Sequence, residues 1–296
     1  SLDAAKEKAH CDFGQFVGGG KRNSSLLKDL SGKAAGLKLY LDQTYGDLKL
    51  DDMTDWLPHF SEWPANAPLA VHAEGKTLGA AILLAATCNR LVHLCHVSRR
   101  EEILIIKAAK ENGIAITCEV CPHHLFLTES DIPAIGQGLS EVRPRLATEA
   151  DRDALWENMD VIDCFATDHA PHTLAEKDGE NPPPGFPGLE TILPLLLTSV
   201  NEGRLTLDDL TIRLDENPRK IFNLPMQDDT FIEVDLKDEY EIRASDHQSR
   251  CGWTPYEGWR ARGRVRRVEM RGRVVYEDGE VLSPPGFGKN VRSNRR

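Results

Sequence analysis

The sequence lacks long apolar runs: none approaches the roughly 20 residues that a membrane-spanning helix needs, and no signal-peptide pattern opens it. It also lacks an excess of positive charge, because 47 Asp and Glu residues outnumber 36 Lys and Arg residues and give a formal net charge of −11. Such a balance argues against binding to nucleic acid or an anionic membrane, although the C-terminal end is locally basic. We therefore expect no nucleic-acid partner and no membrane partner.

Cysteine is present in an odd number, seven, and the residues are widely spread. This pattern argues against a disulfide framework and favours a reducing, cytoplasmic setting. The spacing Cys118-x-x-Cys121 matches a redox pair or half of a zinc site. Residues three apart in a strand point to opposite faces, however, so we do not expect these two thiols to converge.

Residues 35–170 alternate short apolar runs with amphipathic stretches. Apolar runs predict buried strands at 35–41, 68–73, 91–97, 114–120 and 161–168. The stretches between them predict helices at 76–89, 99–112 and 149–159, and Gly113 ends the second of these. This strand–helix repeat indicates a parallel α/β sheet, closed or open, and 296 residues are enough to bury its core.

The pattern changes after residue 181. The proline- and glycine-rich run 182–188 cannot be helical, and helical patterns follow it near 190–201 and 207–217. From residue 231 the pattern predicts short strands separated by turns, with a tight turn at 277–280. We expect an α/β domain at 1–222, a β-rich subdomain at 223–284 and a linker or tail at 285–296.

Four residues with metal or acid–base chemistry stand at or near the ends of predicted strands: Lys38, His72, His96 and Asp168. In a barrel the carboxyl ends of the strands carry the active site, so these side chains would converge, and this donor set suits zinc. A structural histidine and a capping aspartate are the ordinary alternatives. Lys38 is harder to explain, because an unpaired ammonium in an apolar strand is costly. Burial is expected to lower its pKa and free an amine that takes up carbon dioxide.

These residues lie in motifs that resemble a known family. The motifs occur in the order seen in the amidohydrolase superfamily: Gly36-Leu37-Lys38-Leu39-Tyr40-Leu41, Val71-His72-Ala73-Glu74, Cys95-His96-Val97-Ser98, Cys118-Glu119-Val120-Cys121-Pro122-His123-His124 and Thr167-Asp168-His169-Ala170-Pro171-His172. The chain most resembles the dihydroorotase domain of the multifunctional animal pyrimidine-synthesis protein. Residues 141–144 and 184–190 favour dihydroorotase over hydantoinase or allantoinase.

The resemblance implies an amidohydrolase-type (β/α)8 TIM barrel with a small β-sandwich subdomain. It also implies two zinc ions, with Lys38 carboxylated to a carbamate that bridges them, His72 and His96 on one ion and Asp168 on the other. Asp168 would act as general base and acid while a metal-activated hydroxide attacks the ring amide of dihydroorotate. In the biosynthetic direction the same steps close carbamoyl aspartate into dihydroorotate.

The resemblance assigns further residues to substrate. Arg143 and His172 resemble the family's substrate contacts, and an arginine fork can hold a carboxylate in bidentate fashion. A surface ion pair is the alternative for Arg143. Thr44 and Tyr45 fall where the animal enzymes carry a mobile loop that closes over substrate, with Tyr45 in the aromatic position.

Part of the family pattern has no counterpart in this sequence. The opening His-x-His motif is missing, because the early His10 has neither its spacing nor an apolar strand around it. We therefore expect an N-terminally truncated piece of a multifunctional chain that binds fewer than two zinc ions and is inactive alone. The resemblance also implies a possible extra zinc near Cys95 and Glu119, a homo-oligomer, and covalently linked pyrimidine-pathway modules.

Two other functions stay open. A dihydropyrimidinase- or hydantoinase-like cyclic amidase would have no substrate carboxylate for Arg143 to bind. A catalytically silent dihydroorotase-like scaffold would keep the fold without the chemistry. The missing His-x-His motif favours the scaffold for this chain, whereas the presence of Lys38, His72, His96 and Asp168 argues against it for the parent protein.

Overall fold

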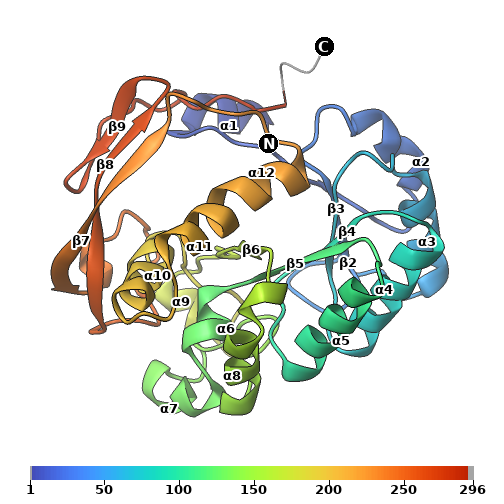
Figure 1. Ribbon diagram of the computed structural model, residues 1–296, viewed down its shortest axis with the longest axis horizontal. Helices are drawn as coiled ribbons and strands as arrows, with labels where there is room; N and C mark the ends of the chain where they lie inside the picture. Colours follow the sequence, from blue (N-terminus) through green and yellow to red (C-terminus); the bar gives the residue numbers. More distant parts are fainter. Residues whose placement is uncertain (1, 293–296) are drawn as a thin grey trace.

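The structure, a computed structural model, describes residues 2–292. Its larger part is a parallel sheet in which every strand pairs with the next one along the chain (Figure 1). The six strands are β1 (Val17–Gly18), β2 (Leu37–Tyr40), β3 (Leu69–His72), β4 (Val92–Leu94), β5 (Ile116–Val120) and β6 (Cys164–Phe165). The predicted parallel α/β class is confirmed. Within residues 2–292, β1 and β6 form the two edges of this sheet.

Apolar side chains alternate with polar ones along β2. Leu37 and Leu39 are fully buried in the main core, whereas Lys38 and Tyr40 are partly exposed on the opposite face. The core is completed by helices that follow the strands: α3 (Met53–Glu62), α4 (Lys76–Thr87), α5 (Arg100–Glu111) and α8 (Glu149–Glu157). The predicted helices 76–89, 99–112 and 149–159 are therefore confirmed to within two residues at each end.

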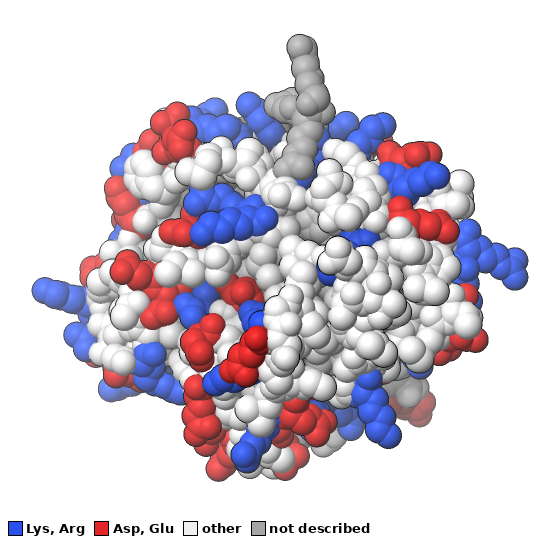
Figure 2. All heavy atoms as spheres, turned by 45° about the vertical axis from the view of Figure 1, so that its right-hand side comes forward, with Lys and Arg blue, Asp and Glu red and all other residues white. Residues whose placement is uncertain are grey.

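Shorter helices lie at the start of the chain and in the connections. They are α1 (Leu2–Lys8), α2 (Ser24–Leu27), α6 (Pro122–Phe126), α7 (Ile132–Ile135) and α9 (Leu174–Lys177). None of the helices in residues 2–292 is long and apolar enough to cross a lipid bilayer. On the face shown in Figure 2, basic and acidic side chains are interspersed.

The predicted strand 161–168 is wrong in extent, because only Cys164–Phe165 is paired. The run begins instead in the 3-10 turn Met159–Val161, and the Asp163 side chain accepts a hydrogen bond from the backbone N–H of Cys118 at 2.7 Å. Its apolar composition reflects burial in the core rather than strand pairing. As a result, Asp168 stands in the loop after β6.

A long helical segment follows the proline-rich loop. It consists of α10 (Ile192–Asn201), α11 (Leu207–Thr211), the π-helical turn η4 (Ile212–Glu216) and α12 (Asn217–Phe222). The predicted helix at 207–217 thus continues to residue 222. Pro218 has no N–H to donate to the preceding turn, and the helical hydrogen bonds widen just before it.

The second part of the structure is an antiparallel sheet, drawn in orange and red in Figure 1. Its strands are β7 (Phe231–Glu241), β8 (Arg260–Met270), β9 (Arg273–Glu277) and β10 (Glu280–Val281), in the order β10-β9-β8-β7. The predicted turn at 277–280 is confirmed, with Asp278 and Gly279 at φ 43° and 98°. Helix α10 is tied to β8, since the Arg262 N–H donates to Thr198 Oγ1 at 2.8 Å.

Residues 285–292, which composition predicted as the start of a tail, run beside the beginning of the chain. The Phe13 N–H donates to the Lys289 carbonyl at 3.0 Å, and the Val291 N–H donates to the Phe13 carbonyl at 2.9 Å. Gly288 permits this close approach, because a Cβ there would lie 1.9 Å from the Cys11 carbonyl oxygen. The remainder of the predicted tail, 293–296, lies outside the described residues.

Candidate metal and substrate site

A cavity of about 320 Å³ lies at the carboxyl-terminal side of the parallel strands. It brings together the four residues predicted as zinc ligands and the four predicted as substrate contacts. Its lining consists of Lys38, Tyr40, Thr44, Tyr45, His72, His96, Arg143, Asp168, Ala170, Pro171, His172, Pro184 and Gly185. The predicted residues, spread over more than a hundred positions of the chain, therefore meet in one place, and their roles stay predictions.

Two buried histidines point at each other in this cavity. His72 ends β3 and His96 follows β4, and their Nδ1 and Nε2 atoms lie 2.8 Å apart. Among the described residues, His72 Nε2 and His96 Nδ1 have no hydrogen-bond partner, although His72 Nε2 approaches Glu74 Oε1 at 3.3 Å. Burial, reinforced by His72 and Lys38, holds the pKa of His96 well below its ordinary value. The His96 imidazole is therefore neutral and offers a lone pair.

Lys38 lies on β2 between this cavity and a second one. Its Nζ donates to Cys95 Sγ at 2.8 Å and sits 5.5 Å from the centre of the Tyr40 ring. Burial lowers the pKa of Lys38, but its interactions with Cys95, Glu119 and Asp168 together raise the pKa by more. This direction runs against the expectation that burial lowers the pKa of Lys38 and frees its amine.

Two of the predicted metal ligands have a strained backbone. His96 and Asp168 have φ values of 39° and 44°, in the left-handed region that costs a residue with a side chain about 1–3 kcal/mol. Strain of this kind persists where the surrounding structure imposes it, and it is concentrated at functional sites. Burial raises the pKa of the Asp168 carboxyl, and the Lys38 ammonium opposes that rise. A carboxyl with a raised pKa holds a proton more readily than an exposed one.

The proline-rich loop holds the segment that follows Asp168. The Ala170 N–H donates to the Phe186 carbonyl at 3.0 Å, and the Gly188 N–H donates to Nδ1 of His169 at 3.1 Å. Gly185 is required here, because its φ is 144° and a Cβ would lie 2.4 Å from the Ala170 carbonyl oxygen. The loop therefore fixes one wall of the cavity.

The predicted substrate residues line the outer part of the cavity. Nη1 of Arg143 donates to Glu141 Oε2 and to the carbonyl of the preceding residue, each at 2.8 Å. The ring of Tyr45, 71% exposed, packs edge-on against the ring of His172 with centroids 5.6 Å apart. Thr44 Oγ1 accepts a hydrogen bond from the backbone N–H of Tyr45. The loop after β2 thus places an aromatic ring at the cavity.

A second cavity, of about 460 Å³, lies on the other side of Lys38. It contains the predicted pair Cys95 and Glu119 together with His93, whose Nε2 lies 3.0 Å from Glu119 Oε2. The ligand atoms of these three residues lie within 4.8 Å of one another. His93 was not predicted, yet a signal exists in the sequence. His93 and Cys95 are two residues apart, so strand alternation puts them on one face.

The donor set of the first cavity fits zinc chemically. His72 and His96 offer imidazole nitrogens, two of them buried and without a partner in residues 2–292, and Asp168 offers a carboxylate. Lys38 would join them only as a carbamate, since an ammonium has no lone pair. The neighbouring strand β1 pairs Gly18 with Lys38 and carries no side-chain donor at either of its two positions.

Comparison with solved structures places the fold. L-hydantoinase (dihydropyrimidinase) from Arthrobacter aurescens superposes with a TM-score of 0.91 at 26% identity, over 97% of this chain and 75% of that one. The inactive dihydroorotase-like domain of the Chaetomium thermophilum CAD-like multifunctional protein gives 0.82 at 29% identity, over 98% and 81%. The fold is thus of the amidohydrolase type.

Sequence relatives narrow this class. The multifunctional protein CAD of Squalus acanthias is 55% identical over 285 residues, which are 96% of this chain and 13% of that protein. A dihydroorotase of Pyrococcus furiosus is 40% identical over 240 residues, 79% of this chain and 56% of that enzyme. No protein-family model matches the chain. The predicted resemblance to the dihydroorotase part of multifunctional pyrimidine-synthesis proteins is confirmed, and the chain spans about an eighth of such a relative's length.

Proposed function

We propose that this chain is the dihydroorotase part of a longer multifunctional protein. Within that protein it catalyses the reversible cyclisation of N-carbamoyl-L-aspartate to L-dihydroorotate in pyrimidine synthesis. The observation that supports this most is the meeting of eight predicted site residues at one cavity, in a chain 55% identical to a multifunctional relative. In this proposal the parallel strands belong to a (β/α)8 barrel and the antiparallel sheet to a small β-sandwich. The parent protein is cytoplasmic and homo-oligomeric.

Four residues would hold the metal ions of this enzyme. His72 and His96 would bind one zinc ion, Asp168 the other, and Lys38 as a carbamate would bridge them. Bound zinc would supply a Lewis acid for the amide carbonyl and lower the pKa of a water nucleophile. Because the pKa of Lys38 is raised by its acidic neighbours, the carbamate requires cations in the cavity that disfavour the ammonium.

The chain's own residues supply the remaining steps. Asp168 faces the cavity, takes a proton from the attacking water and delivers it to the leaving amide nitrogen. Arg143 binds the substrate carboxylate through the guanidinium edge that Glu141 leaves open, and His172 lies beside it in the cavity wall.

The test follows turnover with two substrates. The multifunctional protein that carries this segment is assayed with dihydroorotate and with dihydrouracil, which has the same ring without the carboxylate. We expect turnover of dihydroorotate and a preference for it that is lost in Arg143→Ala. Equal turnover of the two rings would contradict this proposal and favour the dihydropyrimidinase-like alternative. The superposition with L-hydantoinase (dihydropyrimidinase) is the reason for testing that alternative.

Two observations favour a second function for the chain by itself, that of a catalytically silent dihydroorotase-like scaffold. A solved relative at 29% identity is an inactive dihydroorotase-like domain, and β1 of this chain offers no metal ligand. We propose that the 296-residue chain alone binds fewer than two zinc ions and does not cyclise carbamoyl aspartate. Zinc content and cyclisation are measured for this chain and for one extended by a His-x-His segment. Comparable turnover by both would contradict the metal-ligand assignment.

A further inference from the structure

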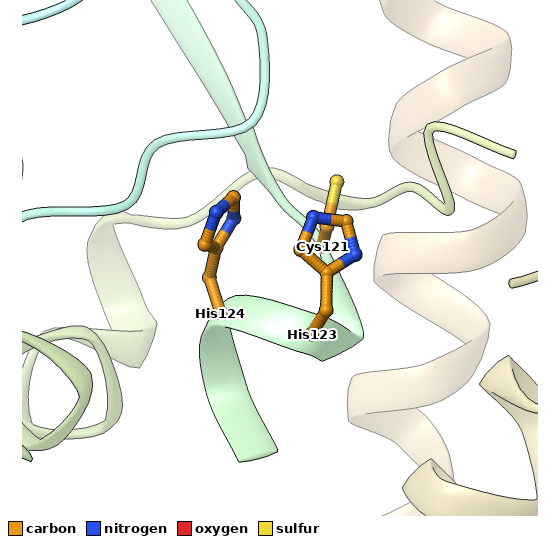
Figure 3. Close-up of side chains that lie close together, drawn as sticks. All are labelled: Cys121, His123 and His124. Atoms are coloured by element: carbon orange, nitrogen blue, oxygen red, sulfur yellow. The ribbon is translucent and has the colours of Figure 1, made fainter. Parts of the chain in front are cut away.

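A separate group of metal-type ligands lies where β5 passes into α6 (Figure 3). Cys121, His123 and His124 are all buried, with exposures of 0%, 3% and 2%. One ligand atom from each lies within 4.8 Å of the others. None of the three lines the cavity described above. They therefore form a cluster of their own, which we call the Cys–His–His cluster.

The local backbone explains why these side chains converge. Cys121 is the residue before α6, and its carbonyl accepts from the N–H groups of His124 at 2.9 Å and Leu125 at 3.3 Å. Pro122 begins the helix, where its missing N–H is not needed. This tight first turn brings the thiol of Cys121 above the His123 ring, and the His124 ring faces that pair (Figure 3).

The tautomer of His124 is fixed by its surroundings. Its Nε2 lies 3.1 Å from the carbonyl oxygen of Pro144, and a carbonyl can only accept, so Nε2 carries the hydrogen. Nδ1 of His124 then carries a lone pair, and it is buried without a partner among the described residues, as is Nε2 of His123. Ring N–H groups donated to a backbone carbonyl orient metal-binding histidines in the same way.

We propose that the Cys–His–His cluster binds one Cu⁺ ion. A thiolate is a soft ligand that favours this ion, imidazole nitrogen also binds copper, and three such ligands complete the coordination of Cu⁺ without a water molecule. Cu⁺ with one thiolate and two neutral imidazoles has no net charge, whereas Zn²⁺ with the same ligands leaves one positive charge. Burial penalises the charged complex. The neighbouring ring of Phe186, 5.2 Å from the His123 ring, adds to this apolar enclosure.

Binding requires the loss of a proton from the thiol. Burial raises the pKa of Cys121 well above its ordinary value, so the empty site holds a neutral thiol. The ion replaces the thiol hydrogen, a sulfur–copper bond forms, and one proton leaves to solvent for each ion bound. Burial lowers the pKa of both histidines, to about 4 for His124, so neither ring must lose a proton first.

The test compares two variants of the full chain under reducing conditions. Cys95→Ser removes the thiol of the neighbouring cluster with His93 and Glu119, and Cys95→Ser/Cys121→Ser differs from it by one sulfur. Each is titrated with Cu⁺ against a chromophoric Cu⁺ chelator. We expect one tightly held Cu⁺ in the first variant, at least a hundredfold weaker binding in the second, and release of one proton per ion. X-ray absorption should give one sulfur and two nitrogens around copper.

Two further measurements decide the outcome. Circular dichroism and the thermal midpoint of both variants show that each is folded. The variant His124→Asn, which has an amide in place of the ring, should weaken the binding of Cu⁺ as Cys121→Ser does. A Zn²⁺ titration with a competing zinc chelator runs in parallel. Equal Cu⁺ retention by the two cysteine variants overturns the site. Cys121-dependent binding of Zn²⁺ in preference to Cu⁺ overturns the charge argument and the assignment of the ion.

Discussion

The two cavities on either side of Lys38 differ in how their residues reach them. The first collects residues from strand ends and loops, among them His72, His96 and Asp168. The second collects residues from within and just beyond neighbouring strands, with His93 inside β4, Cys95 directly after β4 and Glu119 inside β5. The position of a strand end can be predicted from the topology of the sheet alone. The position of a residue inside a strand depends on the strand register as well. Lys38 lines both cavities, so substituting it is the strongest test of whether the two cavities act together.

The largest effect is expected for Lys38→Ala in the multifunctional protein. If Lys38 is the proposed bridging carbamate, its loss should reduce dihydroorotate turnover to background and remove most of the bound zinc, because the two proposed ions would lose a shared ligand. Added short-chain carboxylic acids should restore part of the activity by supplying oxygen ligands. Lys33→Ala, an exposed lysine just before β2, is the matched control and should keep both properties. An intact-mass measurement of an unmodified Lys38 with two zinc ions bound would disprove the carbamate.

A somewhat smaller effect is expected for Asp168→Asn. The change keeps the shape of the side chain and deletes its ability to carry a proton, so kcat should fall by about 10²–10⁴-fold. Zinc content should change much less than in Lys38→Ala, which separates proton transfer from metal binding. Asp178→Asn, an exposed aspartate after α9, serves as the control. Activity of Asp168→Asn within tenfold of the parent would remove the acid–base role from this residue.

The sequence predicted the first cavity well for a physical reason. Parallel strands end at one side of their sheet, so His72 and His96 had to lie close together once the strand–helix repeat was recognised. Asp168 also lines that cavity, although its strand is shorter than predicted and it stands in the loop that follows. His93 was not predicted as a site residue because it lies inside an apolar run, where a histidine has an ordinary structural interpretation. The Cys–His–His cluster was not predicted because Cys121 was considered with Cys118 and not with the two histidines that follow it.

The protonation of Lys38 could not be predicted from the strand alone. An apolar strand indicates burial, and burial by itself lowers the pKa of a lysine. The opposing contribution comes from Cys95, Glu119 and Asp168, which are 57, 81 and 130 residues further along the chain. Only the fold brings them beside Nζ. Local patterns therefore predict where an ionisable group lies better than they predict its charge.

The substrate end of the first cavity offers a more selective test. Arg143→Ala should weaken the binding of the transition state by about 2–3 kcal/mol, as measured from kcat/KM for dihydroorotate, because a charge-assisted contact is lost. The loss for dihydrouracil should be far smaller, since that ring has no carboxylate. Arg145→Ala removes the neighbouring arginine, which is 64% exposed and pairs with the same Glu141, and it is the control. Equal losses for both rings in Arg143→Ala would show that this arginine does not recognise the carboxylate.

The smallest effect is expected at the loop over the first cavity, where Tyr45 packs edge-on against His172 at 5.6 Å. Such a ring pair contributes about 0.5–1.5 kcal/mol, so Tyr45→Ala should lower kcat/KM by less than about tenfold. Tyr45→Phe keeps the ring and should stay close to the parent. A double-mutant cycle with His172→Ala measures the coupling. Coupling of zero would mean that the ring contact does not guide loop closure. A large loss of kcat/KM in Tyr45→Phe would instead show that the hydroxyl of Tyr45 is responsible, and the ring contact with His172 does not involve that hydroxyl.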